Sequence, residues 1–318
     1  MVKYMIGKNI KKEKELKSYC DLIEEGNSFF IGKKKIDIDN LKEELVYILI
    51  NTFNIDKKDY LLNFNIKNLD INNTTTKNVY KKYIKNVKKR MKNEPLQYIF
   101  NTAYFYGREF YVNKNVLIPR FDTEVLVRQV IDFVKSNNKK YNILDLCTGQ
   151  GVILITLLKE ISSNIDKIYG IDISRKALNV LNKNMILHNI NYQNVYIIKS
   201  NLFDKLSKVN FKKGSNLFDI IVCNPPYINK KDYNKLDKEV KNYEPKLALL
   251  GGGDGLYYYR KILKNAKKFL SKTGKIFFEI GYDEASAVLE IVKEYDYGSY
   301  KVINDFNNIN RVIEISVL

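Results

Sequence analysis

Strand-like and helix-like runs alternate from residue 121 to the C-terminus, and this alternation restricts the fold more than any other feature. Short apolar runs are followed by longer stretches with apolar residues at three-to-four spacing. The pattern predicts a mostly parallel α/β sheet covered by helices on both faces. The last two runs, separated by the polar stretch 305–310, predict a hairpin that makes the final strand antiparallel. The expected strands are 141–146, 167–172, 194–199, 218–223, 275–280, 300–304 and 311–317, and the expected helices are 122–136, 151–161, 174–188, 255–270 and 283–294.

The chain before this region has a different pattern. Over residues 1–92, apolar positions such as Leu41 and Leu45 recur at helical spacing, and strand-like alternation is scarce. Between residues 94 and 119 the period becomes that of strands, with Gly107 in a turn, which predicts a β-hairpin. We therefore expect a helical domain at 1–92, a hairpin linker at 93–118 and an α/β domain at 119–318.

Composition excludes several classes of protein. Lys and Arg number 54 against 36 Asp and Glu, giving a formal charge of +18, but Lys, Asn, Ile and Tyr are abundant together. Adenine-thymine-rich coding produces this bias, so we interpret the charge as a solvated surface and expect no specific nucleic-acid partner. Three distant cysteines and one histidine, His188, indicate neither a disulfide framework nor a zinc site, and they argue against a Ser-His or Cys-His hydrolase and a multi-His metal site. His188 is expected to have a structural or solvent-facing role.

Localisation follows from two further patterns. No stretch approaches the ~20 apolar residues that span a bilayer, so we expect no membrane partner. The first residues lack the apolar core of a signal peptide and the Arg-rich, acid-poor character of a transit peptide. We therefore expect a cytoplasmic protein.

Two polar segments follow the first two expected strands, where open α/β sheets bind ligands. Cys147, Thr148, Gly149, Gln150 and Gly151 follow the first strand, and their glycines allow a tight turn close to a ligand. The second strand ends at Asp172, where an acidic residue meets ribose hydroxyls in nucleotide-binding folds. The third glycine of the dinucleotide fingerprint is absent, so a nucleoside without a pyrophosphate fits better.

A third segment, Asn224, Pro225, Pro226 and Tyr227, ends the strand 218–223. The two prolines make the turn rigid and donate no backbone hydrogen bond, which leaves carbonyl acceptors free. The Asn224 side chain adds an acceptor beside the flat ring of Tyr227. The segment therefore predicts an acceptor pocket for a planar NH2 group.

With this segment the sequence resembles the class I S-adenosylmethionine-dependent methyltransferases that modify planar nitrogens. More narrowly, it is similar to the release-factor glutamine N5-methyltransferases, known as the HemK/PrmC family. The resemblance also rests on residues 94–99, 116–124, 243–249 and 252–256, and on Asp305, Arg311 and Val312. It implies a Rossmann-like sheet, a substrate-recognition role for the N-terminal domain and a monomer.

The resemblance also implies roles for individual residues. Asn224, Pro225, Pro226 and Tyr227 would be catalytic, and no metal would be needed. The partner would be a peptide-chain release factor, methylated on the side-chain N5 of the glutamine in its Gly-Gly-Gln loop, with S-adenosylhomocysteine as the second product. The residues implied to bind S-adenosylmethionine are Cys147, Thr148, Gly149, Gln150, Gly151, Asp172, Asn201, Leu202 and Asn224.

Three residues depart from the family pattern. Cys147 stands where the family usually has a glycine, and we expect cofactor binding to survive provided that this residue needs no positive φ. Phe121 replaces a proline, and Asn201 occupies a position that is commonly acidic and contacts the adenine amine.

Two other functions stay open. An N6-adenine methyltransferase acting on DNA or RNA uses the same acceptor chemistry, although no separate base-recognition domain is evident. A catalytically silent nucleic-acid-binding protein is the other alternative, and the intact segment 224–227 argues against it. The run 251–255 lacks the Lys-Ser/Thr ending of a phosphate loop, so we expect it to be a structural loop.

Overall fold

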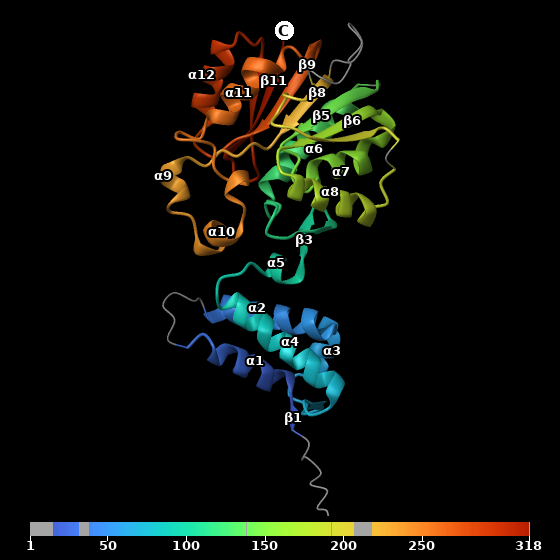
Figure 1. Ribbon diagram of the computed structural model, residues 1–318, viewed down its shortest axis with the longest axis vertical. Helices are drawn as coiled ribbons and strands as arrows, with labels where there is room; N and C mark the ends of the chain where they lie inside the picture. The colour runs from blue at the N-terminus through green and yellow to red at the C-terminus, as the bar shows by residue number, and fades with distance from the viewer. Residues whose placement is uncertain (1–14, 32–37, 138, 192, 207–217, 318) are drawn as a thin grey trace, which may run out of the picture. The chain divides into compact units, whose positions relative to one another are not determined.

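The computed structural model describes residues 15–31, 38–137, 139–191, 193–206 and 218–317 (Figure 1). The chain divides into two compact units, Met1–Phe100 and Asn101–Leu318, and each is described by itself. The predicted linker 93–118 spans this division, and its hairpin is grouped with the second unit. The boundaries at 92/93 and 118/119 stay predictions.

The first unit is built from helices, as expected. They are α1 (Tyr19–Ser28), α2 (Ile38–Phe53), α3 (Lys57–Leu62), α4 (Thr74–Arg90) and α5 (Leu96–Phe100), with a short antiparallel pair β1 (Leu16–Lys17) and β2 (Leu69–Asp70) that sequence patterns did not predict. Ser18 starts α1 with a reciprocal capping box to Asp21. Leu45 and Leu49 of α2 are buried against Tyr83 of α4, whose hydroxyl donates to the Leu22 carbonyl oxygen at 2.8 Å. The predicted helical spacing therefore produces the core of this unit.

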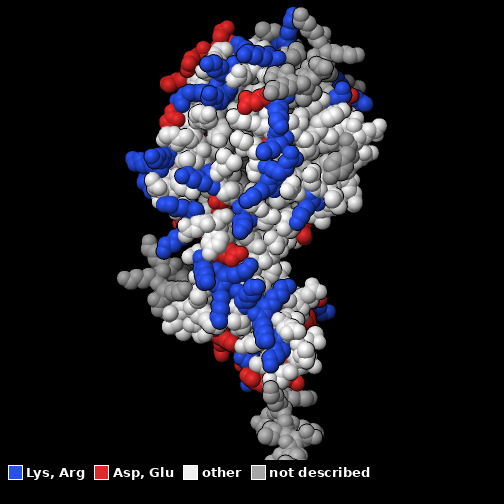
Figure 2. All heavy atoms as spheres, in the orientation of Figure 1, with Lys and Arg blue, Asp and Glu red and all other residues white. Residues whose placement is uncertain are grey.

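Basic side chains in the first unit concentrate on α4. This helix carries lysines throughout and no acidic residue (Figure 2). Lys81 and Lys85 lie one turn apart and are exposed. Like charges at this spacing repel one another by a few tenths of a kcal/mol per pair. The helix is stable because Tyr83 and Val87 bury its other face.

The second unit contains a mixed sheet with the order β10-β11-β9-β8-β5-β6-β7. Its strands are β5 (Tyr141–Leu146), β6 (Ile165–Asp172), β7 (Val195–Lys199), β8 (Phe218–Cys223), β9 (Leu270–Glu279), β10 (Tyr300–Asn304) and β11 (Asn310–Ser316). Adjacent strands in the series β9-β8-β5-β6-β7 run parallel to each other. Strand β11 runs antiparallel to both β9 and β10. The predicted Rossmann-like sheet with an antiparallel last strand is confirmed.

Helices cover both faces of this sheet (Figure 1). One face packs against α6 (Asp122–Lys135), α7 (Val152–Ile161) and α8 (Arg175–Leu187), and the other against α11 (Tyr257–Ala266) and α12 (Ala285–Glu294). Shorter elements are η1 (Ser162–Asn164), α9 (Lys230–Tyr233), α10 (Lys238–Tyr243) and η3 (Lys246–Ala248).

The predicted helix 255–270 is wrong at its end. The Phe269 carbonyl accepts a hydrogen bond from the Phe218 amide at 2.7 Å, and Leu270 already pairs with Phe218 as the first residue of β9. Strand pairing with β8 therefore ends the helix at Ala266, four residues before the apolar periodicity does.

The predicted hairpin is confirmed as β3 (Thr102–Phe105) and β4 (Arg108–Tyr111). Its two turn residues, Tyr106 and Gly107, have φ of 49° and 69°, as a type I′ turn requires. Phe110 is fully buried, and the His188 ring packs against it at 4.6 Å between centroids. This contact confirms a structural role for His188.

Candidate active site

A pocket lies where the segments following β5, β6, β7 and β8 meet, at the carboxyl ends of these parallel strands. It brings together most of the residues that the sequence singled out. Gly151, Pro225 and Tyr227 are not part of its lining. The predicted residues that line it are Cys147, Thr148, Gly149, Gln150, Asp172, Asn201, Leu202, Asn224 and Pro226.

Hydrogen bonds fix the loop after β5 against the end of β6. Thr148 Oγ1 donates to Asp145 Oδ2 at 2.6 Å, and the Thr148 amide donates to the Ile171 carbonyl at 3.0 Å. Burial raises the pKa of Asp145 to about 7, although the Thr148 hydrogen bond opposes this shift. Gly151 has φ of 85°, and a Cβ there would stand 2.9 Å from Leu181 Cγ. Gly151 therefore supports the loop through its conformation and does not line the pocket.

Cys147 has a left-handed backbone, with φ of 60°. We expected cofactor binding to survive the change from glycine to Cys147 provided that this residue needs no positive φ, and that condition is not met. An L-residue in this conformation is less stable than glycine by roughly 1–2 kcal/mol. The pKa of the buried Cys223 thiol is raised chiefly by burial and further by Cys147. The rest of the loop thus holds Cys147 in a backbone conformation that favours glycine.

Asp172 has the geometry expected of a diol acceptor. Its Oδ2 accepts from the Gly149 amide at 3.0 Å, and its Oδ1 accepts from the Ser174 amide at 2.7 Å. Each oxygen keeps a second lone pair, so two adjacent hydroxyl groups can donate to it. Burial raises the pKa of Asp172, and the backbone N–H groups oppose that shift. Ile173 and Leu202 add apolar lining beside this carboxylate.

The lining of the pocket beside Asp172 combines hydrogen-bond acceptors with apolar side chains. Asn201 lines it where the family pattern commonly has an acidic residue, so any contact there comes from an amide. Ser200 and Tyr258 also line the pocket, although sequence patterns did not single them out. The sequence around Ser200 gives no sign of its place in the pocket. Its position follows from the structure, because its amide continues the β6–β7 pairing by donating to the Asp172 carbonyl at 3.0 Å.

Residues 116–120 form one side of the pocket and are held by Glu244. This carboxylate accepts from the Ile118 amide at 3.0 Å and forms an ion pair with Arg120. Gln150 Nε2 donates to the Leu117 carbonyl at 2.8 Å from the other direction. Segments 116–124 and 243–249, which carry the resemblance, thus contact one another beside the pocket.

Residues 249–251 support the loop 224–227 through two backbone hydrogen bonds to Ile228. The Ile228 amide donates to the Leu249 carbonyl, and the Gly251 amide donates to the Ile228 carbonyl, both at 2.9 Å. A Cβ on Gly251 would stand 2.7 Å from the Pro226 carbonyl oxygen, and one on Gly255 would stand 2.5 Å from the Tyr227 carbonyl oxygen. The run 251–255 is the expected structural loop, and its glycines allow the loop 224–227 to pack on it.

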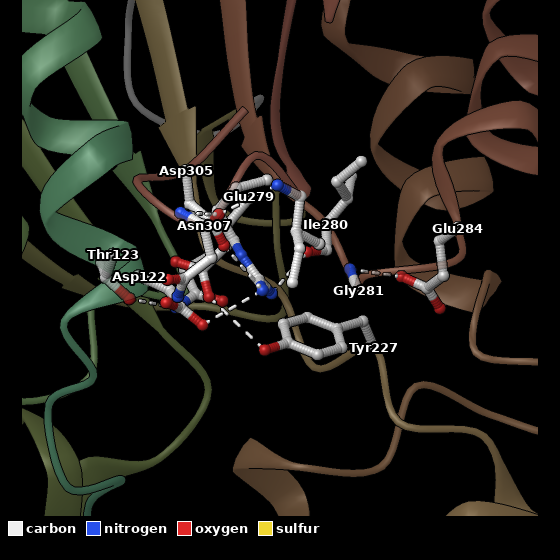
Figure 3. Close-up of polar contacts among 12 residues, drawn as sticks. Asp122, Thr123, Tyr227, Glu279, Ile280, Gly281, Glu284, Asp305 and Asn307 are labelled. Carbon is white, nitrogen blue, oxygen red and sulfur yellow. Dashed lines mark hydrogen bonds and ion pairs between the residues drawn. The ribbon is translucent and has the colours of Figure 1, made fainter. Parts of the chain in front are cut away.

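A buried carboxyl, Glu279, lies behind this loop at the end of β9 (Figure 3). The Tyr227 hydroxyl points to Glu279 Oε1 at 3.5 Å. Asn224 Nδ2 donates to Thr123 Oγ1 at 3.0 Å. Burial raises the pKa of Glu279 to about 7, while Thr123 and Arg311 oppose the shift. Sequence reasoning missed Glu279, because a glutamate at the end of an apolar run gives no signal of its burial.

Comparisons with known proteins agree with this geometry. Residues 109–254 match the family model described as N-6 DNA Methylase. A release factor glutamine methyltransferase from Fusobacterium nucleatum is 39% identical over 282 residues, which cover 88% of this chain and 74% of that protein. One from Clostridium acetobutylicum is 34% identical over 95% of this chain and 96% of its own length. A bifunctional methyltransferase from Rickettsia typhi is 42% identical over 72% of this chain, which spans 46% of that protein.

A solved structure also aligns with part of the chain. A methyltransferase from Pyrococcus furiosus aligns with a TM-score of 0.45 at 15% identity, covering 67% of this chain and 90% of that chain. The sheet and the pocket at its carboxyl edge define an S-adenosylmethionine-dependent methyltransferase of class I. Within that class, the chain belongs to the release factor glutamine methyltransferase family. The predicted family and enzyme class are confirmed.

Two kinds of feature are absent from the described residues. None of the helices among them is long and apolar enough to cross a membrane. Within the same part of the chain, no three His, Cys, Asp or Glu side chains gather as a metal site.

Proposed function

We propose that this enzyme transfers the methyl group of S-adenosylmethionine to the side-chain N5 of the glutamine in the Gly-Gly-Gln motif of peptide-chain release factors. The observation that carries the proposal is that Asn224 lines the same pocket as Asp172. The proposed acceptor for a planar NH2 group and the proposed acceptor for a ribose diol therefore share one pocket. The substrate class comes from the relatives named release factor glutamine methyltransferase.

The cofactor is assigned to the residues that line the pocket. Asp172 would hold the ribose hydroxyls through its free lone pairs, and Ile173 and Leu202 would flank the adenine. Thr148 and Gly149 would border the methionine part. Cys147, Gln150 and Asn201 would complete the lining, with Gly151 setting the turn. When bound, the cofactor supplies a sulfonium methyl group that is already a strong electrophile.

The acceptor loop would position the glutamine amide. Because the lone pair of an amide nitrogen is delocalised into its carbonyl, this nitrogen is a weak nucleophile. Asn224 Oδ1 would accept one of its two hydrogens, favour a pyramidal nitrogen and stabilise the positive charge that develops there. The Pro225 carbonyl would accept the other hydrogen, although Pro225 itself lies outside the pocket lining. Tyr227 is a neutral phenol, since burial raises its pKa, and would lie behind the amide plane.

Positioning is the main contribution of this chain. Holding the nitrogen in line with the methyl carbon supplies about 7–11 kcal/mol in well-oriented reactions. The nitrogen gains the methyl carbon, the carbon–sulfur bond breaks with its electron pair on sulfur, and one amide hydrogen leaves as a proton. The proposed products are N5-methylglutamine and S-adenosylhomocysteine.

One observation favours a second candidate, an N6-adenine methyltransferase. The matching family model is described as N-6 DNA Methylase, and adenine presents the same planar NH2 group. Labelled S-adenosylmethionine offered separately to a release factor, its Gln-to-Ala variant, DNA and RNA decides between the two. We expect label in the release factor alone. Label in DNA or RNA, with none in the release factor, would establish the second candidate.

We further propose a monomer that acts in the cytoplasm, where release factors function. We expect no sequence-selective nucleic-acid binding. The lysines of α4 would bind polyanions weakly, and the affinity would fall as the salt concentration rises.

A further inference from the structure

The proposed reaction leaves one charged residue of the pocket, Arg120, without a role. It belongs to the segment 116–124, which carries the resemblance and forms one side of the pocket. Among the described residues that line the pocket, Arg120 is the only cation and Asp172 is the only anion. A cation in a pocket for a small molecule indicates that the ligand presents an anionic group to it.

Glu244 fixes the Arg120 guanidinium in place. Its Oε1 accepts from Arg120 Nη2 at 2.5 Å, and its Oε2 accepts from the Ile118 amide at 3.0 Å. The Glu244 side chain is 1% exposed, whereas that of Arg120 is 37% exposed. Glu244 is therefore a buried anchor, and the guanidinium stays accessible at the pocket wall.

Most of the Arg120 donors are left for a ligand. A guanidinium carries five N–H groups in a planar fork. Among the described residues, Glu244 is the one acceptor of normal hydrogen-bond geometry for this side chain, and it is bound through Nη2. The rest of the fork can bind the two oxygens of a carboxylate, which is the geometry that Arg prefers.

The methionine part of S-adenosylmethionine carries a carboxylate. This α-carboxylate is the only anionic group of the cofactor, because its sulfonium and its α-ammonium are both cations. Without a contact to the carboxylate, Arg120 would repel these two cations. The ribose end needs an acceptor instead of a cation, and Asp172 has the geometry for it. The two charged residues of the pocket thus match two different parts of one cofactor.

We propose that Arg120 binds the α-carboxylate of S-adenosylmethionine and that Glu244 is the positioning residue that holds Arg120 for this contact. The inference rests on the proposed cofactor and deepens it. The contact assigns the methionine end to the wall 116–120 and the ribose end to Asp172. The sulfonium joins these two parts, so it would lie within the pocket that Asn224 also lines.

The glutamine amide is a less suitable partner for Arg120. The two hydrogens of its NH2 group need acceptors, and a guanidinium only donates. Arg120 can donate only to the amide carbonyl, which would draw the nitrogen lone pair further into that carbonyl. Such a contact would weaken the nucleophile, so the chemistry favours the cofactor as the partner of Arg120.

The test uses a ligand that lacks only the proposed anion. Decarboxylated S-adenosylmethionine keeps the adenosine, the sulfonium and the amine, and it has no carboxylate. Calorimetry with the full chain gives the affinity of each ligand, and no release factor is needed. We expect the wild type to bind S-adenosylmethionine about 10- to 100-fold more tightly than the decarboxylated ligand, the range for charge-assisted hydrogen bonds.

Arg120→Gln tests whether Arg120 causes this preference. Gln keeps an NH2 donor for the buried Glu244 and removes the positive charge and the fork. The variant should bind S-adenosylmethionine about 10- to 100-fold more weakly than the wild type does, and the decarboxylated ligand within about twofold of it. Arg120→Lys keeps the charge without the fork, so it should keep part of the preference.

Arg108→Gln is the matched control. Arg108 pairs with Glu160 at 2.5 Å, its side chain is 28% exposed, and it does not line the pocket. This variant should bind both ligands as the wild type does. Equal weakening of both ligands by Arg120→Gln would mean that Arg120 only supports the wall, and it would overturn the contact with the carboxylate.

Glu244→Gln tests the positioning. It removes the anion that holds the guanidinium, so the preference for the carboxylate should fall, although less than in Arg120→Gln. A full preference in Glu244→Gln would show that Arg120 needs no positioning.

The wild type alone separates this inference from the proposed function. A wild type that binds neither ligand refutes the proposed cofactor. A wild type that binds both ligands equally keeps the cofactor and refutes the role of Arg120.

Discussion

Gly251 lies directly against Pro226. A Cβ on Gly251 would stand 2.7 Å from the Pro226 carbonyl oxygen and 2.4 Å from the Gly255 carbonyl oxygen. Neither neighbour is the flexible end of a side chain, so backbone must move to accept even one methyl group. The acceptor loop thus rests on a glycine whose role is to have no side chain.

Gly251→Ala is therefore expected to displace the loop 224–227. We expect methyl transfer to fall by at least about tenfold, since small displacements of a positioned group weaken catalysis strongly. Affinity for S-adenosylmethionine should change little, because Asp172 holds it from other strands. Single-turnover transfer and calorimetry measure the two effects.

Gly253→Ala is the matched control for this prediction. Gly253 lies in the same run, has nothing within 4 Å of an added Cβ and needs no positive φ. The Gly253→Ala variant should therefore transfer methyl groups at the wild-type rate. Equal losses in the two variants would mean that the whole run, and not the contact with Pro226, matters.

The backbone of Cys147 allows a test of strain. At φ of 60° an L-residue is strained by roughly 1–2 kcal/mol, which glycine avoids, although glycine gains more freedom in the unfolded chain. Cys147→Ala keeps the strain and loses the thiol, whereas Cys147→Gly loses both. We expect the glycine variant to be more stable than the alanine variant by about 0.5–1 kcal/mol. Urea unfolding measures the difference, and a less stable glycine variant would show that the loop does not strain Cys147.

Burial of Glu279 predicts a dependence of stability on pH. Its pKa is raised from 4.5 to about 7, so the folded state keeps a proton that the unfolded state has lost between these values. The contribution of this group to the free energy of unfolding is therefore greatest below about pH 4.5 and falls as the pH rises toward 7. Above about pH 7 it stays constant. Asp145 and Glu284, with pKa values also raised to about 7, add to the same trend. His188, whose pKa is lowered by burial, opposes it.

Glu279→Gln isolates this contribution. Thermal unfolding between pH 5 and pH 8 should show a smaller loss of stability with rising pH in the variant than in the wild type. Glu290→Gln, an exposed substitution on α12, should leave the wild-type curve unchanged. Parallel curves for the wild type and Glu279→Gln would show that Glu279 titrates alike in the folded and unfolded chain.

Much of this site could be read from the sequence, because its parts lie at the ends of predictable strands. Asp172 and Asn224 each follow an apolar run of strand length, and parallel strands bring their ends to one edge. Glu279 also ends such a run, but nothing local distinguishes a buried carboxyl from an exposed one. Its contact with Tyr227 joins residues that only the pairing of β9 with β8 brings together.

The left-handed backbone of Cys147 could not be read from the sequence either. Its residue type gives no sign of positive φ, which depends on how the loop after β5 meets the end of β6. Likewise, the close packing of Gly251 on Pro226 joins two loops through the isolated bridge between Ile228 and Leu250. Local patterns predicted the elements, and tertiary pairing set these details.

Asp172 is expected to control cofactor affinity. Asp172→Ala removes the charged acceptor for the ribose hydroxyls, and losing charge-assisted hydrogen bonds costs on the order of 1.5–3 kcal/mol. Calorimetry should show S-adenosylmethionine binding weakened by that amount, with release-factor binding much less affected. Asp166→Ala, an exposed change on the same strand β6, is the control. Unchanged affinity in a folded Asp172→Ala would remove this residue from the cofactor site.

The last prediction concerns Asn224, on which both candidate functions depend. Asn224 lies in a loop and is half-buried, and among the described residues its side chain donates to Thr123 Oγ1 at 3.0 Å, so Asn224→Ala should fold and bind cofactor almost normally. Methyl transfer should nevertheless fall by about 10²–10³, the usual effect of removing one preorganised partner of the transition state. Single-turnover transfer to the release factor, with cofactor saturating, measures this loss directly. A rate for Asn224→Ala near that of the wild type would mean that the amide nitrogen is positioned by other groups.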